Sequence, residues 1–410
     1  LINNWEATYF DFDTDKLLAI AKSAAEHGIE MLVMDDGWFG HRNDDATSLG
    51  DWFVNENKIK GGLKHLVVQY IGDKAPALDE VNKLGLKFGI WMEPEMISPD
   101  SELYRKHPDW AFAVPERTAT LSRNQYVLDL SRKEVRDYVY ECVHNVISSA
   151  NIEYVKWDMN RQLTDIGSVE FTEDRQGELA HRYVLGVYEL QERLVNDFPD
   201  LLLENCSGGG ARFDPGMLYY SPQIWCSDDT DAIERVKIQY GTSMCYPISS
   251  MGSHVSVVPN HQTRREAPLR TRANAAYFGT FGYELDLGKL TADEIEEVKE
   301  QVRFMKVYRE LIQYGTFYRL ASPFEDEECG WMVVSDDKKT AIVAWFRTLY
   351  TPNKCFTRMK LHGLDPDALY SCNVLGGQAL TVSKTPDGKL IYEKVSEDKG
   401  EDSAVNVIAG

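Results

Sequence analysis

Residues 154–160 read YVKWDMN, an apolar run that carries a lysine and an aspartate two positions apart. Side chains alternate between the two faces of a strand, so Lys156 and Asp158 are predicted to share one face with Tyr154. A charge pair on one face of an apolar strand is either a structural ion pair or part of a functional site. The sequence on either side of this run decides both the fold and the choice between these two interpretations.

The run lies between two stretches with the spacing of amphipathic helices, residues 132–150 and 178–198. Short apolar runs and helical stretches alternate in this way up to about residue 310. Strands joined by crossovers of about a dozen residues pair in parallel. Eight such strands fit a closed (β/α)8 TIM barrel, because an open sheet would carry a glycine-rich phosphate turn after its first strand and this chain has none.

The predicted elements of the barrel can be given by their residues. The predicted strands are residues 5–10, 30–36, 87–93, 125–130, 153–159, 200–206, 223–229 and 246–253. The predicted helices are residues 13–28, 73–85, 132–150, 178–198, 232–244, 271–285 and 291–315, the last with Thr291 as its N-cap.

The pattern changes after about residue 320, where short runs of period two alternate with turn-forming clusters and no helical stretch remains. The sequence therefore predicts a catalytic barrel over residues 1–320 and a small C-terminal antiparallel β-sandwich domain over residues 321–410. The expected strands of that domain are residues 331–337, 340–348, 368–375, 389–395 and 405–409.

Composition limits the partners of this chain. The net charge of -21 is spread along the sequence and repels phosphate backbones and anionic membranes, so neither nucleic acid nor a membrane is an expected partner. A neutral small molecule such as a sugar fits this charge. Seven scattered cysteines with no CxxC pair are typical of a reducing compartment, and we expect a cytoplasmic protein. Because the chain begins with Leu1 rather than methionine, we expect a piece of a longer polypeptide.

Polar residues gather at the C-terminal ends of the predicted strands, which is where a TIM barrel carries its active site. Tryptophans accompany them, and their flat rings suit the apolar faces of sugars. The polar residues are Asp35, Asp36, Glu93, Glu95, Lys156, Asp158, Asn160, Glu204, Asn205, Cys206, Ser227, Asp228, Asp229, Thr230 and Asp231. The tryptophans are Trp5, Trp38, Trp52, Trp91, Trp157 and Trp225.

This set of residues suits cleavage of a glycosidic bond, which takes one ionised and one protonated carboxyl group. Asp158 suits the ionised role of nucleophile, because Lys156 shares its strand face and Asn160 can donate a hydrogen bond. The acid needs a raised pKa, and Asp228 is the first candidate. Asp229 and Asp231 remain rivals, since the strand ends there and its parity cannot choose among them.

Other interpretations of these motifs exist. The Asp35–Asp36 pair could be structural. Residues 207–216, SGGGARFDPG, resemble a phosphate loop but lack the lysine and spacing of a P-loop, so we expect their glycines to let backbone N–H groups approach a ligand hydroxyl. Cys206 as a nucleophile would need a base, and no histidine lies in the neighbouring strands. The acids could chelate Mg²⁺, but Lys156 stands where the charge of the metal would be. We therefore expect no metal and no cofactor.

Six motifs in order resemble glycoside hydrolase family 36, chiefly bacterial α-galactosidases. They are NNWEA at 3–7, DDGWFG at 35–40, GIWMEPEM at 89–96, KWDMNR at 156–161, ENCSGGGARFDPGM at 204–217 and WCSDDTDAIERVKIQYG at 225–241. The resemblance implies a retaining hydrolase that releases terminal α-linked galactose from melibiose or raffinose through a covalent intermediate. It also implies that Asp158 is the nucleophile and Asp228 the acid/base.

The resemblance extends to the sugar pocket. It assigns Asp35 and Asp36 to the outer hydroxyls of galactose, and Trp5 to the side of the leaving group. Further sugar-contacting positions that it implies are Trp91, Arg123, Lys156, Asn160, Cys206 and Gly208.

Alternatives within the same family are an α-N-acetylgalactosaminidase and a galactosyl transferase of the raffinose-synthase type. An inactive carbohydrate-binding fragment is the alternative from another class. Family members usually carry a large β-sandwich domain before the barrel, and tetrameric members use it in assembly. The sequence begins at the first predicted barrel strand, so we expect it to lack that N-terminal β-sandwich domain, while the resemblance implies a homo-oligomer.

Overall fold

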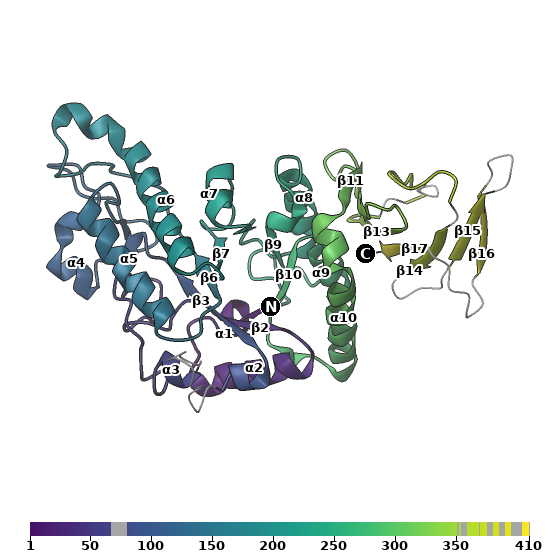
Figure 1. The fold of residues 1–410 in the computed structure, drawn as a ribbon, viewed down its shortest axis with the longest axis horizontal. Coiled ribbons are helices and arrows are strands. Elements are labelled where there is room, and N and C mark those ends of the chain that lie inside the picture. Colours follow the sequence, from purple (N-terminus) through teal and green to yellow (C-terminus); the bar gives the residue numbers. More distant parts are fainter. Residues whose placement is uncertain are drawn as a thin grey trace. The chain divides into compact units, whose positions relative to one another are not determined.

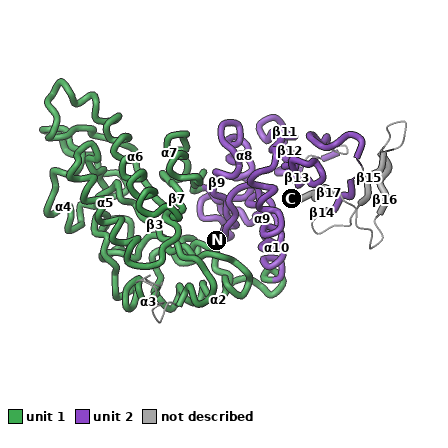
Figure 2. The backbone as a smooth tube through the Cα atoms, viewed as in Figure 1, with its two compact units in different colours: residues 1–228, 283–295 green, residues 229–282, 296–410 purple. Residues whose placement is uncertain are grey.

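The computed structural model describes residues 1–66, 80–350, 352–353, 359–368, 370–374, 380–384, 390–394 and 404–409. The chain divides into two compact units (Figure 2). The first consists of residues 1–228 and 283–295, and the second of residues 229–282 and 296–410.

Eight strands form a closed barrel, which confirms the predicted TIM-barrel fold (Figure 1). Their order around the barrel is β1-β10-β9-β8-β7-β6-β3-β2, and the paired neighbours run parallel. The strands are β1 (Ile2–Asn3), β2 (Met31–Met34), β3 (Lys87–Met92), β6 (Tyr154–Trp157), β7 (Leu202–Asn205), β8 (Gln223–Trp225), β9 (Met251–Ser256) and β10 (Thr280–Glu284).

Two of the eight predicted barrel strands are wrong. Residues 125–130 contain only the short strand β5 (Tyr126–Val127), which pairs antiparallel with β4 (Met96–Ile97) outside the barrel. Residues 5–10 are not extended, because Trp5–Thr8 form the short helix α1, and the first strand β1 precedes them. The apolar run at 125–130 has a strand-like composition, and its pairing partner alone keeps it out of the barrel.

The prediction missed barrel strand β10, which lies in the stretch 271–285 that was predicted as one helix. Helix α9 (Leu269–Ala276) covers the first part of that stretch, and Gly279 separates it from β10. An alanine beta-carbon at Gly279 would lie 2.7 Å from the Met251 carbonyl oxygen, so the glycine permits a close approach to β9. Because of these changes, Asp158 follows the fourth barrel strand and Asp228 the sixth, rather than the fifth and seventh.

The longer predicted helices are confirmed. They are α2 (Thr14–Glu26), α5 (Lys133–Ser148), α6 (Leu179–Asp197), α8 (Ala232–Thr242) and α10 (Ala292–Tyr314). The hydroxyl of Thr291 accepts from the Glu294 backbone while Glu294 accepts from the Thr291 backbone, a capping box that starts α10. The predicted helix 73–85 lies mostly outside the described residues, and its end forms the 3₁₀ turn η1 (Asn82–Leu84).

The remaining helical elements are short. The α-helices are α3 (Leu63–Leu66), α4 (Glu102–Lys106) and α7 (Pro215–Tyr220). The 3₁₀ turns are η2 (Pro108–Trp110), η3 (Glu173–Glu178), η4 (Ile248–Ser250) and η5 (Leu287–Lys289). Among the described residues, no helix is long and apolar enough to cross a membrane.

The C-terminal part forms a seven-stranded sheet, as predicted for a β module after the barrel. Its order is β11-β12-β13-β17-β14-β15-β16, and β17 runs parallel to both neighbours while the other pairs are antiparallel. Met332, Val334, Ala341, Val343 and Tyr370 form an apolar cluster on it. The strands are β11 (Thr316–Ala321), β12 (Glu328–Val334), β13 (Thr340–Arg347), β14 (Tyr370–Val374), β15 (Leu380–Lys384), β16 (Leu390–Lys394) and β17 (Ala404–Ala409).

Gly186 lets α6 approach the segment that precedes α5. An alanine beta-carbon at Gly186 would lie 2.2 Å from the Leu130 carbonyl oxygen, a backbone atom that cannot rotate away. We expect Gly186→Ala to lower the free energy of unfolding by about 1–3 kcal/mol, although alanine favours helices, because the close approach is lost. Urea denaturation measures this change.

Gly177 is the matched control for that substitution. A beta-carbon at Gly177 in η3 would meet no atom within 4 Å, so Gly177→Ala should leave the unfolding midpoint nearly unchanged. Equal stability of the two variants would contradict the close-approach explanation.

Candidate active site

The predicted site residues in the first unit lie on the barrel strands and at their C-terminal ends. Trp91 and Lys156 belong to β3 and β6. Asp35 follows β2, Asp158 follows β6 and Cys206 follows β7, while Asp228 comes three residues after β8. The barrel closure therefore brings these side chains, far apart in sequence, to one rim.

Asp158 is buried and accepts several hydrogen bonds. The indole N–H of Trp91 donates to its Oδ2 at 3.1 Å, and the side-chain amide of Asn160 donates to the same oxygen at 2.9 Å. The backbone N–H of Met159 donates to Oδ1 at 2.8 Å. Hydrogen bonds from N–H donors of this kind favour the charged form of a carboxylate.

Asp228 has a different environment, with the indole N–H of Trp225 donating to its Oδ1 at 3.1 Å. Burial, followed by the negative charge of Asp158, raises the pKa of Asp228, and the ammonium of Lys156 offsets this only in part. The two carboxyl groups therefore influence each other's charge.

Asp231, one of the two other candidates for the acid, caps a helix in the second unit. It is the N-cap of α8 and accepts from the backbone N–H groups of Ile233 and Glu234. Burial acts to raise the pKa of Asp231, but hydrogen bonds from Thr263 and from the helix backbone outweigh it and lower that pKa. A group held in its ionised form at a helix start is a poor proton donor.

Lys156 is a buried cation among the acids. Its ammonium donates to Asp35 at 3.0 Å and lies 5.6 Å from the ring centre of Trp225. Burial, the largest single influence, acts to lower the pKa of Lys156, but negative charges led by those of Asp35 and Glu284 raise it well above the ordinary lysine value. Lys156 therefore stays charged and compensates the acidic rim.

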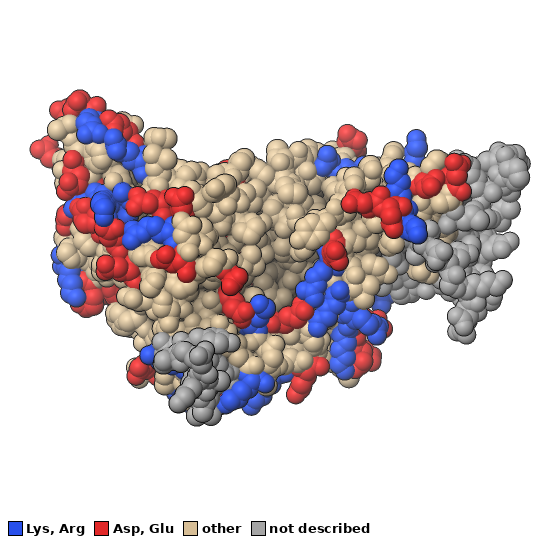
Figure 3. Space-filling view, in the orientation of Figure 1, with Lys and Arg blue, Asp and Glu red and all other residues tan. Residues whose placement is uncertain are grey.

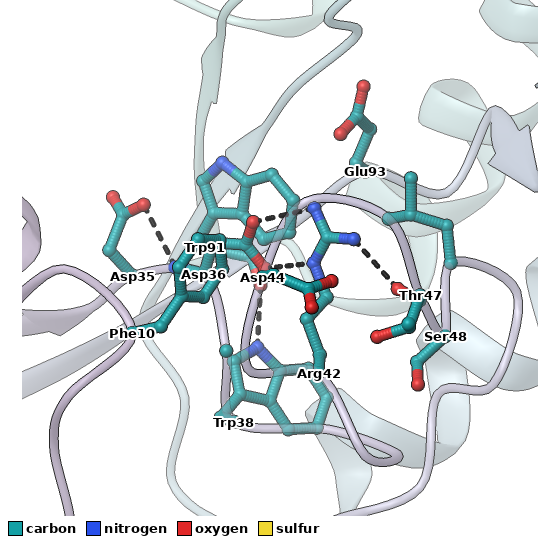
Figure 4. A network of polar contacts seen from close by, with 12 residues as sticks. Phe10, Asp35, Asp36, Trp38, Arg42, Asp44, Thr47, Ser48, Trp91 and Glu93 are labelled. Atoms are coloured by element: carbon teal, nitrogen blue, oxygen red, sulfur yellow. Dashed lines mark hydrogen bonds and ion pairs between the residues drawn. The ribbon is translucent and has the colours of Figure 1, made fainter. Parts of the chain in front are cut away.

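Asp36 is held by Arg42, which reaches it from the loop after β2 (Figure 4). Nε and Nη2 of Arg42 donate to the two carboxylate oxygens at 2.7 and 2.8 Å, and both side chains are buried. Burial raises the pKa of Asp36, while the charge of Arg42 opposes that rise. A bidentate pair of this kind fixes the direction of the carboxylate.

The glycine-rich segment after β7 packs against the segment that carries Asp228. A beta-carbon at Gly209 would lie 2.8 Å from the Asp228 backbone nitrogen, and one at Gly210 would lie 2.6 Å from the Cys226 carbonyl oxygen. Sequence reasoning attributed these glycines to the approach of a ligand. The structure shows instead that two of them permit the approach of backbone, which positions Asp228.

Cys206 is a buried thiol beside the two carboxyl groups. Burial and the negative charges of Asp158 and Asp228 raise the pKa of Cys206 well above its ordinary value. A protonated, buried thiol is a poor nucleophile. A pocket-lining role for Cys206 stays a prediction.

The remaining predicted residues lie around this group. The Asn160 side chain touches Asp158, and Gly208 is exposed with a φ of 53° near the Asn160 side-chain oxygen. Arg123 lies on an exposed loop, and its charge reaches Asp228. Trp5 is partly buried, and its ring packs edge-on against Tyr9 and Phe10.

Residues 1–315 match the family described as Melibiase. The chain belongs to the melibiase family. Residues 328–383 match the glycosyl hydrolase family 36 C-terminal domain. The chain is 56% identical over 376 residues to the α-galactosidase AgaA of Geobacillus stearothermophilus, covering 92% of this chain and 50% of AgaA. It is 51% identical over 384 residues to the α-galactosidase Mel36A of Lactobacillus acidophilus, covering 93% of this chain and 51% of that protein.

Solved structures of α-galactosidases share the fold of this melibiase family member. The crystal structure of AgaA matches with a TM-score of 0.86 over 90% of this chain and 50% of the AgaA chain. A variant of AgaA has been solved in complex with raffinose, with the same TM-score. The chain thus spans about half the length of the relatives that it matches.

Three residues at this melibiase-type site were not assigned from sequence. Arg42 lies in a loop, six residues after the acid that it binds, and no regular spacing marks it. Glu284 ends β10 with 2% exposure, and its charge acts on Lys156 and Asp228, but the misassigned helix 271–285 concealed it. Glu93 was placed at a strand end without a role, and it binds Asn160.

Two of the six tryptophans, Trp38 and Trp157, support the site rather than line it. Trp38 and Trp157 are fully buried, and Trp38 donates to the Trp91 carbonyl oxygen at 2.8 Å (Figure 4). Trp157 donates to Glu95 at 2.7 Å. The tryptophan content that suggested sugar stacking is therefore explained to a large extent by packing and by indole hydrogen bonds.

A cavity of about 380 Å³ adjoins this group within the first unit. Asn160 and Gly208 line it, as do Tyr183 and Val187 of α6. Among the described residues, no group of three His, Cys, Asp or Glu side chains is arranged to hold a metal ion. Asn160 is therefore a wall residue that contacts Asp158 and borders open space.

Replacement of Arg42 tests whether its positive charge compensates the buried carboxylate of Asp36. We expect Arg42→Met to lower the free energy of unfolding by about 3–5 kcal/mol, because it leaves a buried carboxylate without its cation. The loss should grow as pH rises, since protonation of Asp36 at lower pH removes the unpaired charge. Thermal unfolding across pH measures it.

Arg105 is the control, because its ion pair with Asp100 lies at the surface and both side chains are about half exposed. Arg105→Met should leave the melting temperature nearly unchanged at every pH. A pH-independent loss in Arg42→Met would contradict the role given to Asp36.

Proposed function

We propose that this protein is a retaining α-galactosidase that releases terminal α-linked galactose from galactosides of the melibiose and raffinose type. One observation carries the proposal. Two carboxyl groups at the barrel rim differ in their surroundings, since Asp158 is buried and accepts three hydrogen bonds, while burial and the charge of Asp158 raise the pKa of Asp228. A glycosidase needs such a nucleophile and acid. The names of the matched relatives and the raffinose complex of AgaA support the substrate class.

In the first step, a carboxylate oxygen of Asp158 attacks the anomeric carbon of galactose. The bond from that carbon to the leaving-group oxygen breaks, and the proton of Asp228 passes to that oxygen. The products are a galactosyl ester on Asp158 and a free alcohol, with Asp228 left as a carboxylate. The raised pKa of Asp228 supports this step, because it keeps the proton available.

In the second step, Asp228 takes a proton from water, and the water oxygen attacks the anomeric carbon. The ester bond to Asp158 breaks, and both carboxyl groups return to their starting states. Esterification removes the charge of Asp158, which is the second largest cause of the raised pKa of Asp228. Loss of that charge favours the ionised form of Asp228, and the ionised form is the base that this step needs.

Binding of galactose is assigned to the residues around the two acids. Asp35 and Asp36 accept from the outer hydroxyls, and the contacts of each with a cation leave further lone pairs of the carboxylate for a ligand. Trp5 is assigned to the leaving-group side. The remaining contacts are assigned to Trp91, Arg123, Lys156, Asn160, Cys206 and Gly208.

The surroundings of the site fit a neutral small molecule. Acidic and basic side chains lie intermixed over α4, α5 and α6 on the face shown in Figure 3, with surface pairs such as Lys133–Asp137 and Arg175–Glu178. Such a surface does not favour nucleic acid. We also propose a cytoplasmic location and a homo-oligomer. The free thiols of Cys206, Cys226 and Cys329 support a reducing compartment.

Replacement of the nucleophile gives the first test. We expect Asp158→Ala to lower kcat/KM for an aryl α-galactoside by at least about a thousandfold, a loss of about 4 kcal/mol in transition-state stabilisation. Added azide should partly restore turnover and yield a galactosyl azide of inverted configuration. Wild-type protein with azide, and Asp229→Ala with azide, are the controls. Turnover near that of the wild type in a folded Asp158→Ala protein would remove Asp158 from this role.

Replacement of the acid gives the second test. Asp228→Ala should lose much less activity on an aryl galactoside with a good leaving group than on raffinose, because a good leaving group needs little protonation. Steady-state kinetics on both substrates measure the ratio of the two losses. Asp229→Ala, which replaces the adjacent rival, should lose equal factors on both. If Asp228→Ala also lost equal factors, the acid assignment would be wrong.

A further inference from the structure

Glu93 follows β3 and is 0% exposed. It accepts three hydrogen bonds, none from a charged group. The Gln125 amide donates to Oε1 at 2.6 Å, the Asn160 backbone N–H donates to the same oxygen, and the Asn160 side-chain amide donates to Oε2 at 3.1 Å. Two of its three bonds therefore hold Asn160, the residue that also donates to Asp158.

The Asn160 amide is shared between two carboxyl groups. Its Nδ2 donates to Oε2 of Glu93 and, at 2.9 Å, to Oδ2 of Asp158. An amide nitrogen carries two hydrogens, so both bonds can form at once. The side-chain oxygen faces Gly208 instead, since a beta-carbon there would lie 4.0 Å from it. Rotation of the amide by half a turn would place that oxygen against both carboxyl groups.

We propose that Glu93 is a positioning residue that fixes the orientation of the Asn160 amide, so that Asn160 donates to the nucleophile Asp158 rather than opposing it. The role in turnover rests on the proposed glycosidase function. Glu93 does not touch the reacting atoms and acts only through Asn160. Nothing in the sequence motif marks this, because Glu93 and Asn160 are 67 positions apart.

The charges around Glu93 make the contact sensitive to protonation. Burial, followed by the negative charge of Asp158, raises the pKa of Glu93 to about 7, and Arg42 opposes the rise. Tyr183 of α6 also lies within reach of its charge. All three N–H groups that bond to Glu93, one from Gln125 and two from Asn160, are donors, so the ionised carboxylate can accept from each of them. Protonation adds a hydrogen where an acceptor is needed.

Glu95 offers a matched control two residues away. It is also 0% exposed, but it binds Trp157, Tyr183 and Arg212, with the Arg212 guanidinium at 2.8 Å. None of these contacts involves Asn160 or Asp158. Substitution of Glu95 therefore disturbs a buried carboxylate of the same segment without disturbing the amide.

Kinetics on a double-mutant cycle test the role in turnover. In E93Q the new amide nitrogen faces the Asn160 amide nitrogen, and the clash is relieved when Asn160 turns its oxygen toward Asp158. We expect E93Q to lower kcat by about 10–100-fold with KM changed by less than about threefold. E93D, which keeps the carboxylate, should recover part of that loss. In an N160A background, E93Q should have almost no further effect.

A measurement without substrate tests the positioning itself. With asparagine labelled with ¹⁵N, the side-chain amide resonances of Asn160 are identified by their absence in N160A. In the wild type they should shift with pH around a midpoint of about 7, the value to which the pKa of Glu93 is raised, and this titration should vanish in E93Q. E95Q should lower the melting temperature, keep the titration, and leave kcat within about twofold.

The two arms separate the two proposals. If the wild type turned over no galactoside but the Asn160 resonances titrated as described, the proposed function would fail while the positioning by Glu93 stood. An Asn160 amide without titration near neutral pH, or losses in E93Q and N160A that simply add, would overturn the positioning role. Should E93Q fail to fold, E93D and the wild-type titration still decide it.

Discussion

The acidic rim of the barrel depends on the ion pair that the buried ammonium of Lys156 forms with Asp35. A closed barrel brings the strand ends together, and here that closure gathers Asp35, Asp158, Glu204 and Glu284 in a buried group with one another. Buried carboxylates repel each other strongly unless a cation lies among them. Lys156 supplies that cation from within β6, where its ammonium donates to Asp35. The lysine in an otherwise apolar strand is therefore a requirement of the acids that face it.

The two candidate catalytic carboxyl groups share one kind of hydrogen bond, from an indole N–H, and differ in their other neighbours. Each accepts an indole N–H at 3.1 Å, Asp158 from Trp91 and Asp228 from Trp225. Asp158 gains further donors from Asn160 and its own following peptide, which stabilise its charge. Asp228 instead experiences that charge as a neighbour, and its pKa rises. The charge of Asp158, together with burial, thus raises the pKa of Asp228.

The sequence predicted those parts of the fold and site that depend on near neighbours. Alternation of strands and helices indicated the barrel, and the spacing of Asp158 and Asn160 indicated their contact, because two positions in an extended segment share a face. The assignment of 271–285 to one helix failed because the alanines that end α9 are followed within four residues by β10, with no proline between the two elements. Arg42 was missed because a loop has no period, and its contact with Asp36 exists only after the loop folds back.

Two glycines, Gly209 and Gly210, also help to position the candidate site. Gly209 and Gly210 lie so close to the segment of Cys226–Asp228 that any beta-carbon would collide with its backbone. The segment that carries Asp228 is thus positioned by contact between two loops at a distance that only glycine permits. Asp158 is positioned by polar side chains, with Glu93 behind Asn160. The segment of Asp228 is thus held by close backbone packing and Asp158 by polar donors, so the two carboxyl groups are supported in two different ways.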